Sequence, residues 1–315
     1  MSLEPFELHR RRLRALAYRM LGSCSEADDM VQEAWLRWQA ADPATVQDPL
    51  AYLCRTTTHL CLDHLQSARV RREQYVGLWL PEPLVNEALA DFQPTDPEAA
   101  LGLRQQLSMG FLLALQHLSP LERAAFLLHD VFDLGFDELA LTLERSAAAC
   151  RQLASRARRR LRAQGFDADR PCAPDERFLG EIHPQRLALL DALAQALSSG
   201  NLDALTRLLA EDVRLHSDGG GLVSAVPVPL NGRLRVAKAL LAFARAWQRD
   251  PGAQTLQAAE VNGQPGALVW NAQGALEQVC ALDLDARGLV RGLYFQRNPL
   301  KLQRIDRALA PVQHG

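Results

Sequence analysis

Residues 146–162 read SAAACRQLASRARRRLR, and this stretch decides how the middle of the chain folds. Ser146 is a favourable helix N-cap, and the residues after it repeat at helical spacing. The predicted buried face consists of Cys150, Leu153, Ala157 and Leu161. A short helix around Leu139 and Leu143, which begins after a turn at Gly135, precedes this stretch. A short helix, a tight turn and a basic helix together predict a helix-turn-helix.

A basic helix of this kind fits the major groove of DNA, where arginine and glutamine make paired hydrogen bonds to guanine and adenine edges. The outward residues are Arg151, Gln152, Ser155, Arg156, Arg158 and Arg159. Arg151 and Gln152 are best placed to read bases, whereas the arginines from Arg156 onward are placed to contact phosphates. The alternative is an arginine-rich helix that is only solvated, and the turn and short helix before it disfavour that interpretation.

The chain has 315 residues, which predicts two or three domains. Its formal net charge is −2, from 35 basic and 37 acidic residues, but these charges are segregated along the chain. Local basic patches govern attraction to phosphate, so the total charge does not exclude DNA binding. No stretch approaches the roughly 18 apolar residues of a membrane span, and the start lacks a signal-peptide pattern. We therefore expect a cytoplasmic protein without a membrane partner.

Three amphipathic helices are predicted in residues 1–76. The first ends at Gly22, a good helix C-cap, and the second begins near Ser25, which forms a capping-box pattern with the acid three residues later. The third opens at Asp48-Pro49, an N-cap followed by a proline at the first helical position. The second helix has a polar face of Asp28, Asp29, Gln32 and Glu33. A charged face is usually only solvated, so this face alone assigns no partner.

Proline-containing stretches at 77–100 and 165–176 predict linkers. They leave helical domains at 1–76 and 101–164 and a C-terminal domain at 177–315. In the last domain, helices over 187–197 and 202–209 come before strand-like runs around 213–216, 267–270, 277–284 and 289–295. Helices followed by strands predict an α+β domain.

The six cysteines are scattered without a paired Cys-x-x-Cys element, and several fall on buried helix faces. Cys61 and His64 could supply half of a zinc site, but no second Cys/His pair lies nearby in the sequence. We expect buried, reduced thiols, no metal site and no cofactor.

Several segments together resemble a known family. Residues 18–22 (YRMLG) and 26–37 (EADDMVQEAWLR) are similar to region 2 of the extracytoplasmic-function sigma factors of bacterial RNA polymerase. Residues 118–132 (LSPLERAAFLLHDVF) and 150–158 (CRQLASRAR) are similar to region 4. The strings WLPEPL at 79–84, DGGG at 218–221 and NPLKL at 298–302 resemble the subgroup that carries a fused SnoaL-like domain.

The resemblance implies two all-α sigma domains, a region 2 bundle and a region 4 helix-turn-helix, followed by an α+β SnoaL-like domain with a cone-shaped sheet. It implies that the polar face of the second helix binds the clamp helices of the polymerase β′ subunit. The residues implied at the −10 promoter element are Asp63, Arg69, Arg71 and Arg72. The helix after Ser146 would read the −35 element. The expected partners are the polymerase core, through its β′ and β subunits, and promoter DNA.

The resemblance also implies that the C-terminal domain regulates the sigma domains through the first linker. The residues expected to make these contacts are Trp79, Leu80, Pro81, Leu84, Asp218, Gly219, Gly220, Gly221, Asn298, Pro299 and Lys301. The alternative is that Trp79, Leu80 and Leu84 pack locally against the first helical domain. The sequence departs from the subgroup at Leu222, where a basic residue is expected.

Two other functions compete with a sigma factor. A small-molecule cyclase or isomerase would need a shielded acid or base, and the candidates are His216, Asp218, Asp283 and Tyr294. They form no clear acid/base pair in the sequence, so we assign no catalytic residue and expect no enzyme, although an unknown small molecule could still bind the C-terminal domain. A simple helix-turn-helix repressor has no need for the acidic face of the second helix.

Overall fold

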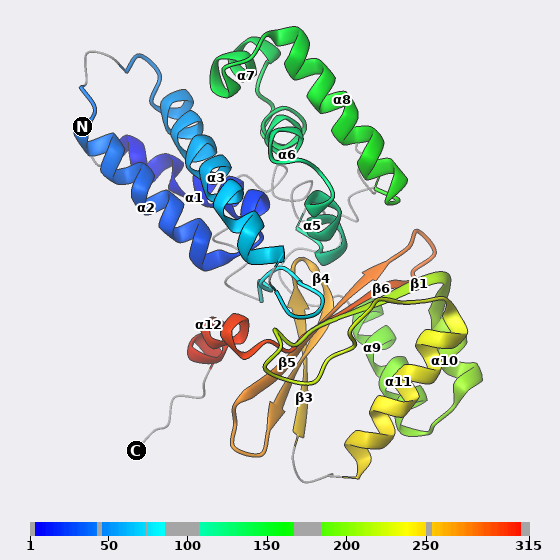
Figure 1. The fold of residues 1–315 in the computed structure, drawn as a ribbon. Helices are drawn as coiled ribbons and strands as arrows, with labels where there is room; N and C mark the ends of the chain where they lie inside the picture. Colours follow the sequence, from blue (N-terminus) through cyan, green and yellow to red (C-terminus); the bar gives the residue numbers. More distant parts are fainter. Residues whose placement is uncertain are drawn as a thin grey trace. The chain divides into compact units, whose positions relative to one another are not determined.

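The structure is a computed structural model that describes residues 4–42, 46–73, 75–85, 107–166, 184–249 and 254–309, without the side chains of 68–73, 254 and 306–309 (Figure 1). The described residues divide into two compact units. The helical unit contains 4–42, 46–73, 107 and 111–166, and the C-terminal unit contains 75–85, 108–110, 184–249 and 254–309.

The helical unit begins with α1 (Glu4–Leu21), α2 (Cys24–Ala40) and α3 (Pro49–Glu73). α1 ends at Gly22, whose φ of +74° lies in the left-handed region that glycine adopts without strain. The Ser23 Oγ accepts the backbone N–H of Glu26 and caps α2. The predicted cap at Ser25 is therefore wrong, because Ser25 already lies inside the helix. Asp48 caps α3 as predicted, since its carboxylate accepts two backbone N–H groups of the first turn.

The unit continues with α5 (Met109–Gln116), whose first two residues belong to the C-terminal unit, then α6 (Pro120–Phe126), the π-helical turn η3 (Leu127–Val131), α7 (Phe136–Leu143) and α8 (Ala147–Ala163). Ser119 and Glu122 form a capping box at the start of α6, with the Glu122 Oε2 3.0 Å from the Ser119 backbone nitrogen. The π turn widens the helix after α6, so the Phe132 N–H reaches back to the Leu127 carbonyl.

Three arginines lie where α1 packs against α6 and η3. Arg19 and Arg123 are 1% and 3% exposed. The Arg123 guanidinium donates to the Met20 carbonyl, and the Arg12 Nη2 donates to the Phe132 carbonyl at 2.7 Å. The guanidinium carbons of Arg12 and Arg19 lie 5.7 and 5.9 Å from the centre of the Phe132 ring. Burial lowers the pKa of Arg19 to about 10, so the side chain remains charged at neutral pH.

The C-terminal unit contains a six-stranded sheet in the order β2-β1-β6-β5-β4-β3. Its strands are β1 (Leu209–Asp218), β2 (Leu230–Asn231), β3 (Gln254–Val261), β4 (Gln264–Asn271), β5 (Leu276–Leu284) and β6 (Val290–Gln296). β1 and β6 are parallel, and every other neighbouring pair is antiparallel. The parallel pairing places the C-terminal ends of β1 and β6 side by side.

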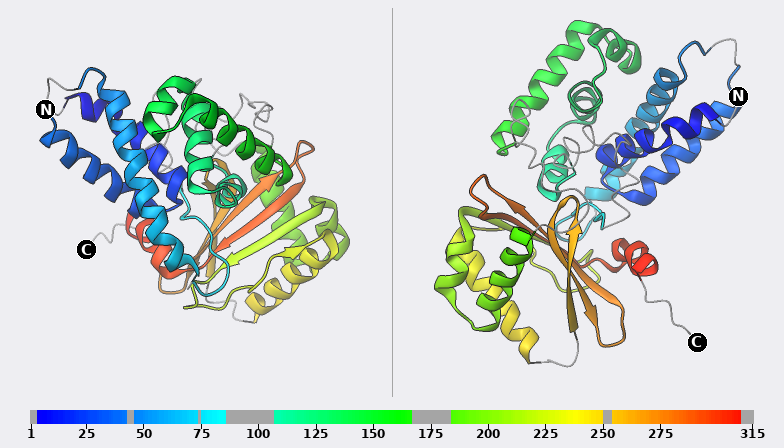
Figure 2. Two further views of the ribbon diagram at one scale, coloured as in Figure 1. Left: turned by 45° about the horizontal axis from the view of Figure 1, so that its top comes forward. Right: turned by 180° about the vertical axis from the view of Figure 1, so that it is seen from behind.

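Three helices, α9 (Pro184–Ser198), α10 (Leu202–Leu208) and α11 (Arg233–Gln248), cover one face of this sheet (Figure 2). The apolar strand residues packed beneath them include Val213, Leu215, Leu282 and Leu293. Because successive side chains of a strand point to opposite faces, the alternate residues belong to the other face. These are His216 and Asp218 of β1, Asp283 of β5, and Tyr294 and Gln296 of β6. A last helix, α12 (Pro299–Leu309), packs beside β5.

The predicted fold class is confirmed, since a run of helices precedes an α+β unit. The predicted strands correspond to β1, β4, β5 and β6. Sequence reading assigned no element to β3, whose run QTLQAAEV has a weak strand pattern, or to α11. The two predicted helical domains share one compact unit, and residues 77–85 of the predicted first linker cluster with the C-terminal unit. Residues 86–100 and 167–176 of the predicted linkers lie outside the described residues.

None of the described helices is both long and apolar enough to cross a membrane. The thiols of Cys24, Cys54, Cys61 and Cys150 are buried and that of Cys280 is partly buried, while Cys172 lies outside the described residues. Burial raises the pKa of Cys54 and Cys280 to about 11, which keeps both thiols protonated at neutral pH. In the part of the chain that is described, no group of three His, Cys, Asp or Glu side chains could hold a metal ion.

Candidate functional site

Helix α8 turns its predicted DNA-binding face to solvent. Ser146 caps the helix by accepting the Ala149 N–H at 3.2 Å, and the predicted apolar stripe is buried. The exposed residues are Arg151, Gln152, Ser155, Arg156 and Arg159, and Arg158 is half-buried. The guanidinium of Arg151 lies 5.2 Å from the centre of the Phe136 ring at the start of α7. This contact places Arg151 at the junction of the two helices of the helix-turn-helix.

Two other arginines of α8 bind a buried carboxylate of the same unit. The Glu122 side chain is 4% exposed, and its two oxygens accept from the Arg156 Nε at 3.1 Å and the Arg160 Nη1 at 2.5 Å. Burial alone would raise the pKa of Glu122, but hydrogen bonds from Ser119 and Arg156 and the charge of Arg160 outweigh it and hold the pKa below its usual range. Glu122 therefore joins the start of α6 to the middle of α8.

Arg158 is also paired inside the unit, since its Nε lies 2.6 Å from the Asp130 Oδ1. Of the arginines predicted to contact phosphates, Arg156, Arg158 and Arg160 thus have intramolecular partners. Arg159 is exposed and makes no ion pair within the described residues, so it can contact DNA without first breaking one. Arg159 is therefore the phosphate contact that the geometry favours most.

The predicted polymerase-binding face of α2 divides into two parts. Asp28 is half-buried and accepts from the Arg14 Nη2 of α1 at 3.1 Å, so it joins α1 to α2. Asp29 and Gln32 are exposed. Glu33 is half-buried and pairs with Arg37 one turn further on, at 3.2 Å. Asp29 and Gln32 are consequently the most accessible residues of this face.

The predicted −10 residues lie towards the end of α3. Asp63 is exposed, while the side chains of Arg69, Arg71 and Arg72 lie outside the described residues, although α3 runs through them. Nearer the middle of the helix, the His59 Nε2 lies 2.7 Å from the Thr142 carbonyl of α7. This hydrogen bond joins α3 to the helix-turn-helix within the helical unit.

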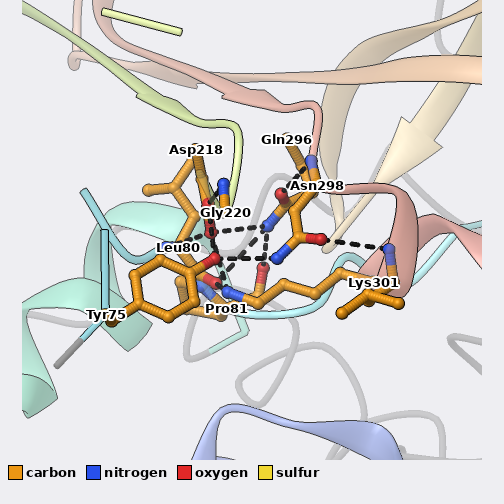
Figure 3. A network of polar contacts seen from close by, with 9 residues as sticks. Tyr75, Leu80, Pro81, Asp218, Gly220, Gln296, Asn298 and Lys301 are labelled. Carbon is orange, nitrogen blue, oxygen red and sulfur yellow. Dashed lines mark hydrogen bonds and ion pairs between the residues drawn. The ribbon is translucent and has the colours of Figure 1, made fainter. Parts of the chain in front are cut away.

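Asp218, at the end of β1, is the centre of a polar network in the C-terminal unit (Figure 3). Its side chain is fully buried. The Oδ1 accepts from the Tyr75 hydroxyl at 2.6 Å and from the Gly220 N–H at 2.9 Å. The Oδ2 accepts from the Leu80 N–H at 2.9 Å and from the Lys301 ammonium at 2.7 Å. One carboxylate thereby binds the 75–85 segment to the sheet and to α12.

The Lys301 ammonium is enclosed by the same segment. Besides Asp218, its Nζ donates to the Leu80 carbonyl at 2.6 Å. The nitrogen lies 4.4 Å from the centre of the Trp79 ring and 5.0 Å from that of Tyr75. An ammonium near two aromatic rings gains a cation–π attraction in addition to its hydrogen bonds. The side chain is 11% exposed, so water screens these interactions little.

Gln296 and Asn298 complete the network. The Gln296 Nε2 lies 3.3 Å from the Pro81 carbonyl, and its Oε1 accepts the Asn298 N–H at 3.0 Å. The Asn298 Nδ2 donates to the Tyr75 hydroxyl at 2.8 Å. Burial and the hydrogen bond to the Asp218 carboxylate raise the pKa of Tyr75, so its hydroxyl remains a donor.

The glycines after Asp218 let these groups approach. Gly220 and Gly221 have φ values of +62° and +72°. A Cβ at Gly220 would collide with the Asn298 amide, and one at Gly221 would press on Val76. A Cβ at Gly219 would collide with the Val223 carbonyl of the following loop. At Gly220, a side chain would both strain the backbone and displace Asn298 from the network.

Further along the segment, Leu84 binds the turn between β3 and β4. The Leu84 N–H donates to the Asn262 Oδ1 at 3.0 Å, and the Asn262 N–H donates to the Leu84 carbonyl at 2.8 Å. Val85 makes an antiparallel bridge with Val261, the last residue of β3. Residues 75–85 are thus bound at two places on the C-terminal unit.

We call these contacts the linker clasp. It contains most of the residues predicted for regulatory contacts, and Pro299 begins the helix that carries Lys301. Sequence reading missed Tyr75, Gln296 and Asn262. Gln296 becomes recognisable only once β6 is known to pair in parallel with β1, which places it beside Asp218. Tyr75 lies just outside the predicted linker, and no pattern in the sequence distinguishes it.

Comparisons with known proteins agree with this architecture. Residues 6–71 match the family model for sigma-70 region 2, and residues 108–161 match the model for sigma-70 region 4. The chain is 37% identical over 268 residues to the ECF RNA polymerase sigma factor SigJ of Mycobacterium tuberculosis, which covers 85% of this chain and 80% of SigJ. It is 32% identical over 302 residues to SigG of the same species, covering 89% and 77% of the two chains. The crystal structure of SigJ superposes with a TM-score of 0.72 at 31% identity, covering 96% of this chain and 98% of SigJ.

Proposed function

The chain belongs to the extracytoplasmic-function sigma factors of RNA polymerase, and on this premise we propose that its C-terminal unit modulates promoter-specific transcription through the linker clasp. Members of this family are transcription initiation factors, and the chain is not an enzyme. As for any sigma factor, its partners are the RNA polymerase core and promoter DNA. A sigma factor works where its polymerase is, so we assign it to the cytoplasm.

The clasp is the observation that carries the regulatory part of the proposal. It binds residues 75–85, which lie between the region 2 match and the region 4 match, to a unit that belongs to neither region. A sigma factor must place these two regions on promoter elements that lie apart. A contact that binds the connecting chain therefore restricts where the two regions can go. Polymerase can change that equilibrium only if it has different affinities for the clasped and released forms.

For the polymerase contact, we propose that α2 binds the β′ clamp helices through Asp29 and Gln32, with Glu33 beside them. Exposure supports this assignment, because Asp28 is already paired with Arg14. We assign the −35 contact to α8, with Arg151 and Gln152 on base edges and Arg159 on phosphate. The exposed Ser155 lies on the same face. The end of α3, with Asp63 and the arginines at 69, 71 and 72, would engage the −10 element.

Transcription in vitro with core polymerase and a cognate promoter tests the proposal. Trp79→Ala removes an aromatic ring from Lys301, and we expect it to change the core concentration at half-maximal transcription by threefold or more. Trp247→Ala, an exposed tryptophan of α11, is the matched control and should have no effect. If the parent protein gives no core-dependent transcript, the assignment as a working sigma factor fails. If Trp79→Ala behaves like Trp247→Ala, the regulatory role of the clasp fails.

A further inference from the structure

A second carboxylate in the C-terminal unit binds a different piece of the chain. Asp283 of β5 is half-buried with its Oδ1 shielded from solvent, and its Oδ2 accepts the backbone N–H of Gly110 at 3.1 Å. The Ser108 side chain also donates to the Asp283 carboxylate. Ser108 to Gly110 cluster with the C-terminal unit, whereas residues 111–166 cluster with the helical unit. The contact therefore lies where the chain enters region 4, whose family match begins at residue 108.

The position of Gly110 makes this hydrogen bond consequential. Gly110 is the second residue of α5, and the first N–H groups of a helix have no acceptor within the helix. The Asp283 carboxylate supplies that acceptor and places a negative charge beside the positive end of the helix. Ser108 and Gly110 are both buried. The first turn of α5 is thus completed by a residue about 170 positions later in the sequence.

Tyr294 of β6 braces the Asp283 carboxylate from the sheet. Its hydroxyl donates to the Asp283 Oδ2 at 3.3 Å, and its ring stacks on His216 of β1. Asp283 pairs with Gly292 across the two strands, and a Cβ at Gly292 would collide with the Tyr294 hydroxyl. The absence of a side chain at Gly292 is what lets Tyr294 reach diagonally to Asp283.

The two carboxylates belong to the same face of the sheet. Asp218 and Asp283 alternate with apolar residues that pack under α9, α10 and α11, so both belong to the face that these helices leave free. Strand β6 lies between their strands and contacts both, through Gln296 to Asp218 and Tyr294 to Asp283. Asp218 binds the chain leaving region 2, and Asp283 binds the chain entering region 4.

We propose that Asp283 is a positioning residue that binds the start of region 4 to the C-terminal unit. Together with the linker clasp, it binds both ends of the connection between the two sigma regions, 75–85 and 108–110, to one sheet. This inference rests on the proposed function and extends it, because it assigns the unit control over region 4 as well as over the linker. The residue acts on the chain itself and requires no small-molecule ligand.

Amide hydrogen exchange of the full-length protein tests the contact. In Asp283→Ala, the Gly110 N–H loses its acceptor, and we expect it to exchange at least tenfold faster than in the parent. Asp283→Asn retains a carbonyl oxygen at the same place and should remain within threefold of the parent. Ser108→Ala should increase the Gly110 exchange rate by an intermediate factor. If Asp283→Ala does not fold, the Ser108→Ala result decides whether the contact exists. Glu211→Gln, which removes an exposed carboxylate of β1, is the control.

A transcription assay then shows whether Asp283 positions region 4 for function or only packs locally against the start of α5. Among the same variants, Asp283→Ala should change the core concentration at half-maximal transcription by threefold or more. Asp283→Asn should keep the value of the parent. The inference is overturned if the Gly110 exchange rate of both Asp283→Ala and Ser108→Ala stays within twofold of the parent. It is also overturned if the exchange rate rises but the core titration superposes on that of the parent. A parent without core-dependent transcription would instead refute the proposed function, and the exchange result would still decide the contact.

Discussion

Replacing Lys301 with alanine should open the linker clasp, and the contacts allow the effect to be estimated. The ammonium pairs with Asp218 at 2.7 Å, where the carboxylate is fully buried, and donates to the Leu80 carbonyl at 2.6 Å. Removing one partner of a buried ion pair costs about 3–5 kcal/mol. Asp218 keeps hydrogen bonds from Tyr75, Leu80 and Gly220, so the lower figure applies. About 3 kcal/mol increases the opening equilibrium roughly 150-fold.

The Leu80 N–H reports this opening directly, because it donates to Asp218. We expect its amide exchange in Lys301→Ala to be roughly 150-fold faster than in the parent if the clasp opens as a local unit. The chain has only two lysines among its 35 basic residues, and the other, Lys238, is exposed on α11. Lys238→Ala is therefore a matched control. If the Leu80 exchange rate in Lys301→Ala is within threefold of that in Lys238→Ala, the ammonium does not stabilise the clasp.

Four further outcomes follow from other contacts. Arg151→Ala should cost about 1–3 kcal/mol of binding free energy on a duplex with a matched −35 element and little on a scrambled duplex, whereas Arg159→Ala should weaken binding to both duplexes alike. Binding titrations on the two duplexes measure the difference, and equal losses on both duplexes for both variants would contradict the assignment. Asp29→Lys should weaken core binding in a pull-down without lowering the melting temperature, and unchanged binding would remove the docking assignment. Glu122→Gln should destabilise the helical unit by about 1–3 kcal/mol in thermal unfolding, because it weakens the buried pairing of two arginines, and an unchanged melting temperature would exclude this role. Burial raises the pKa of Asp283 to about 6, so between the unfolded and folded pKa values the folded protein holds this proton and the unfolded chain does not. The contribution of this group to stability should therefore fall by about 2 kcal/mol from pH 4 to pH 6 and be absent in Asp283→Asn, and identical pH profiles of denaturant unfolding for the two proteins would refute it.

Local capping chemistry made much of the helical unit predictable. The Ser119 and Ser146 caps lie where the sequence indicates, because a side-chain oxygen and an uncapped N–H two or three residues later are enough to define them. The Ser25 prediction failed for a local reason too, since Ser23 offers the same oxygen two residues earlier and Gly22 ends the preceding helix. The sequence alone could not show which of the two serines, Ser23 or Ser25, caps the helix after so short a connection.

The long-range contacts were less accessible to sequence reading. Arg19 and Arg123 look like ordinary surface residues of amphipathic helices, yet both are buried. Arg19 donates to the Ala15 carbonyl of its own helix and lies near the Phe132 ring, and Arg123 donates to the Met20 carbonyl of α1. Asp283 looked like a catalytic candidate because it is an acid in a strand. Its partners, Gly110 and Ser108, are about 170 residues away, and no local pattern signals them. Resemblance to family motifs pointed to the clasp residues, because motifs far apart in the sequence can mark residues that meet in the fold.

The chemistry of the sheet explains why carboxylates suit both linker contacts. A segment that leaves regular structure exposes backbone N–H groups without partners, and a buried carboxylate offers two oxygens that can accept several of them. Asp218 accepts from two backbone N–H groups and from the Tyr75 hydroxyl, and Asp283 accepts from one backbone N–H and two hydroxyls. The difference is the cation. Lys301 neutralises Asp218, whereas burial without such an ion pair raises the pKa of Asp283. Salt should act little on either shielded group. Because burial raises the pKa of Asp283 to about 6, mild acid protonates this carboxyl and removes the cost of burying its charge, so lowering the pH through 6 should stabilise the folded state through Asp283 rather than weaken it.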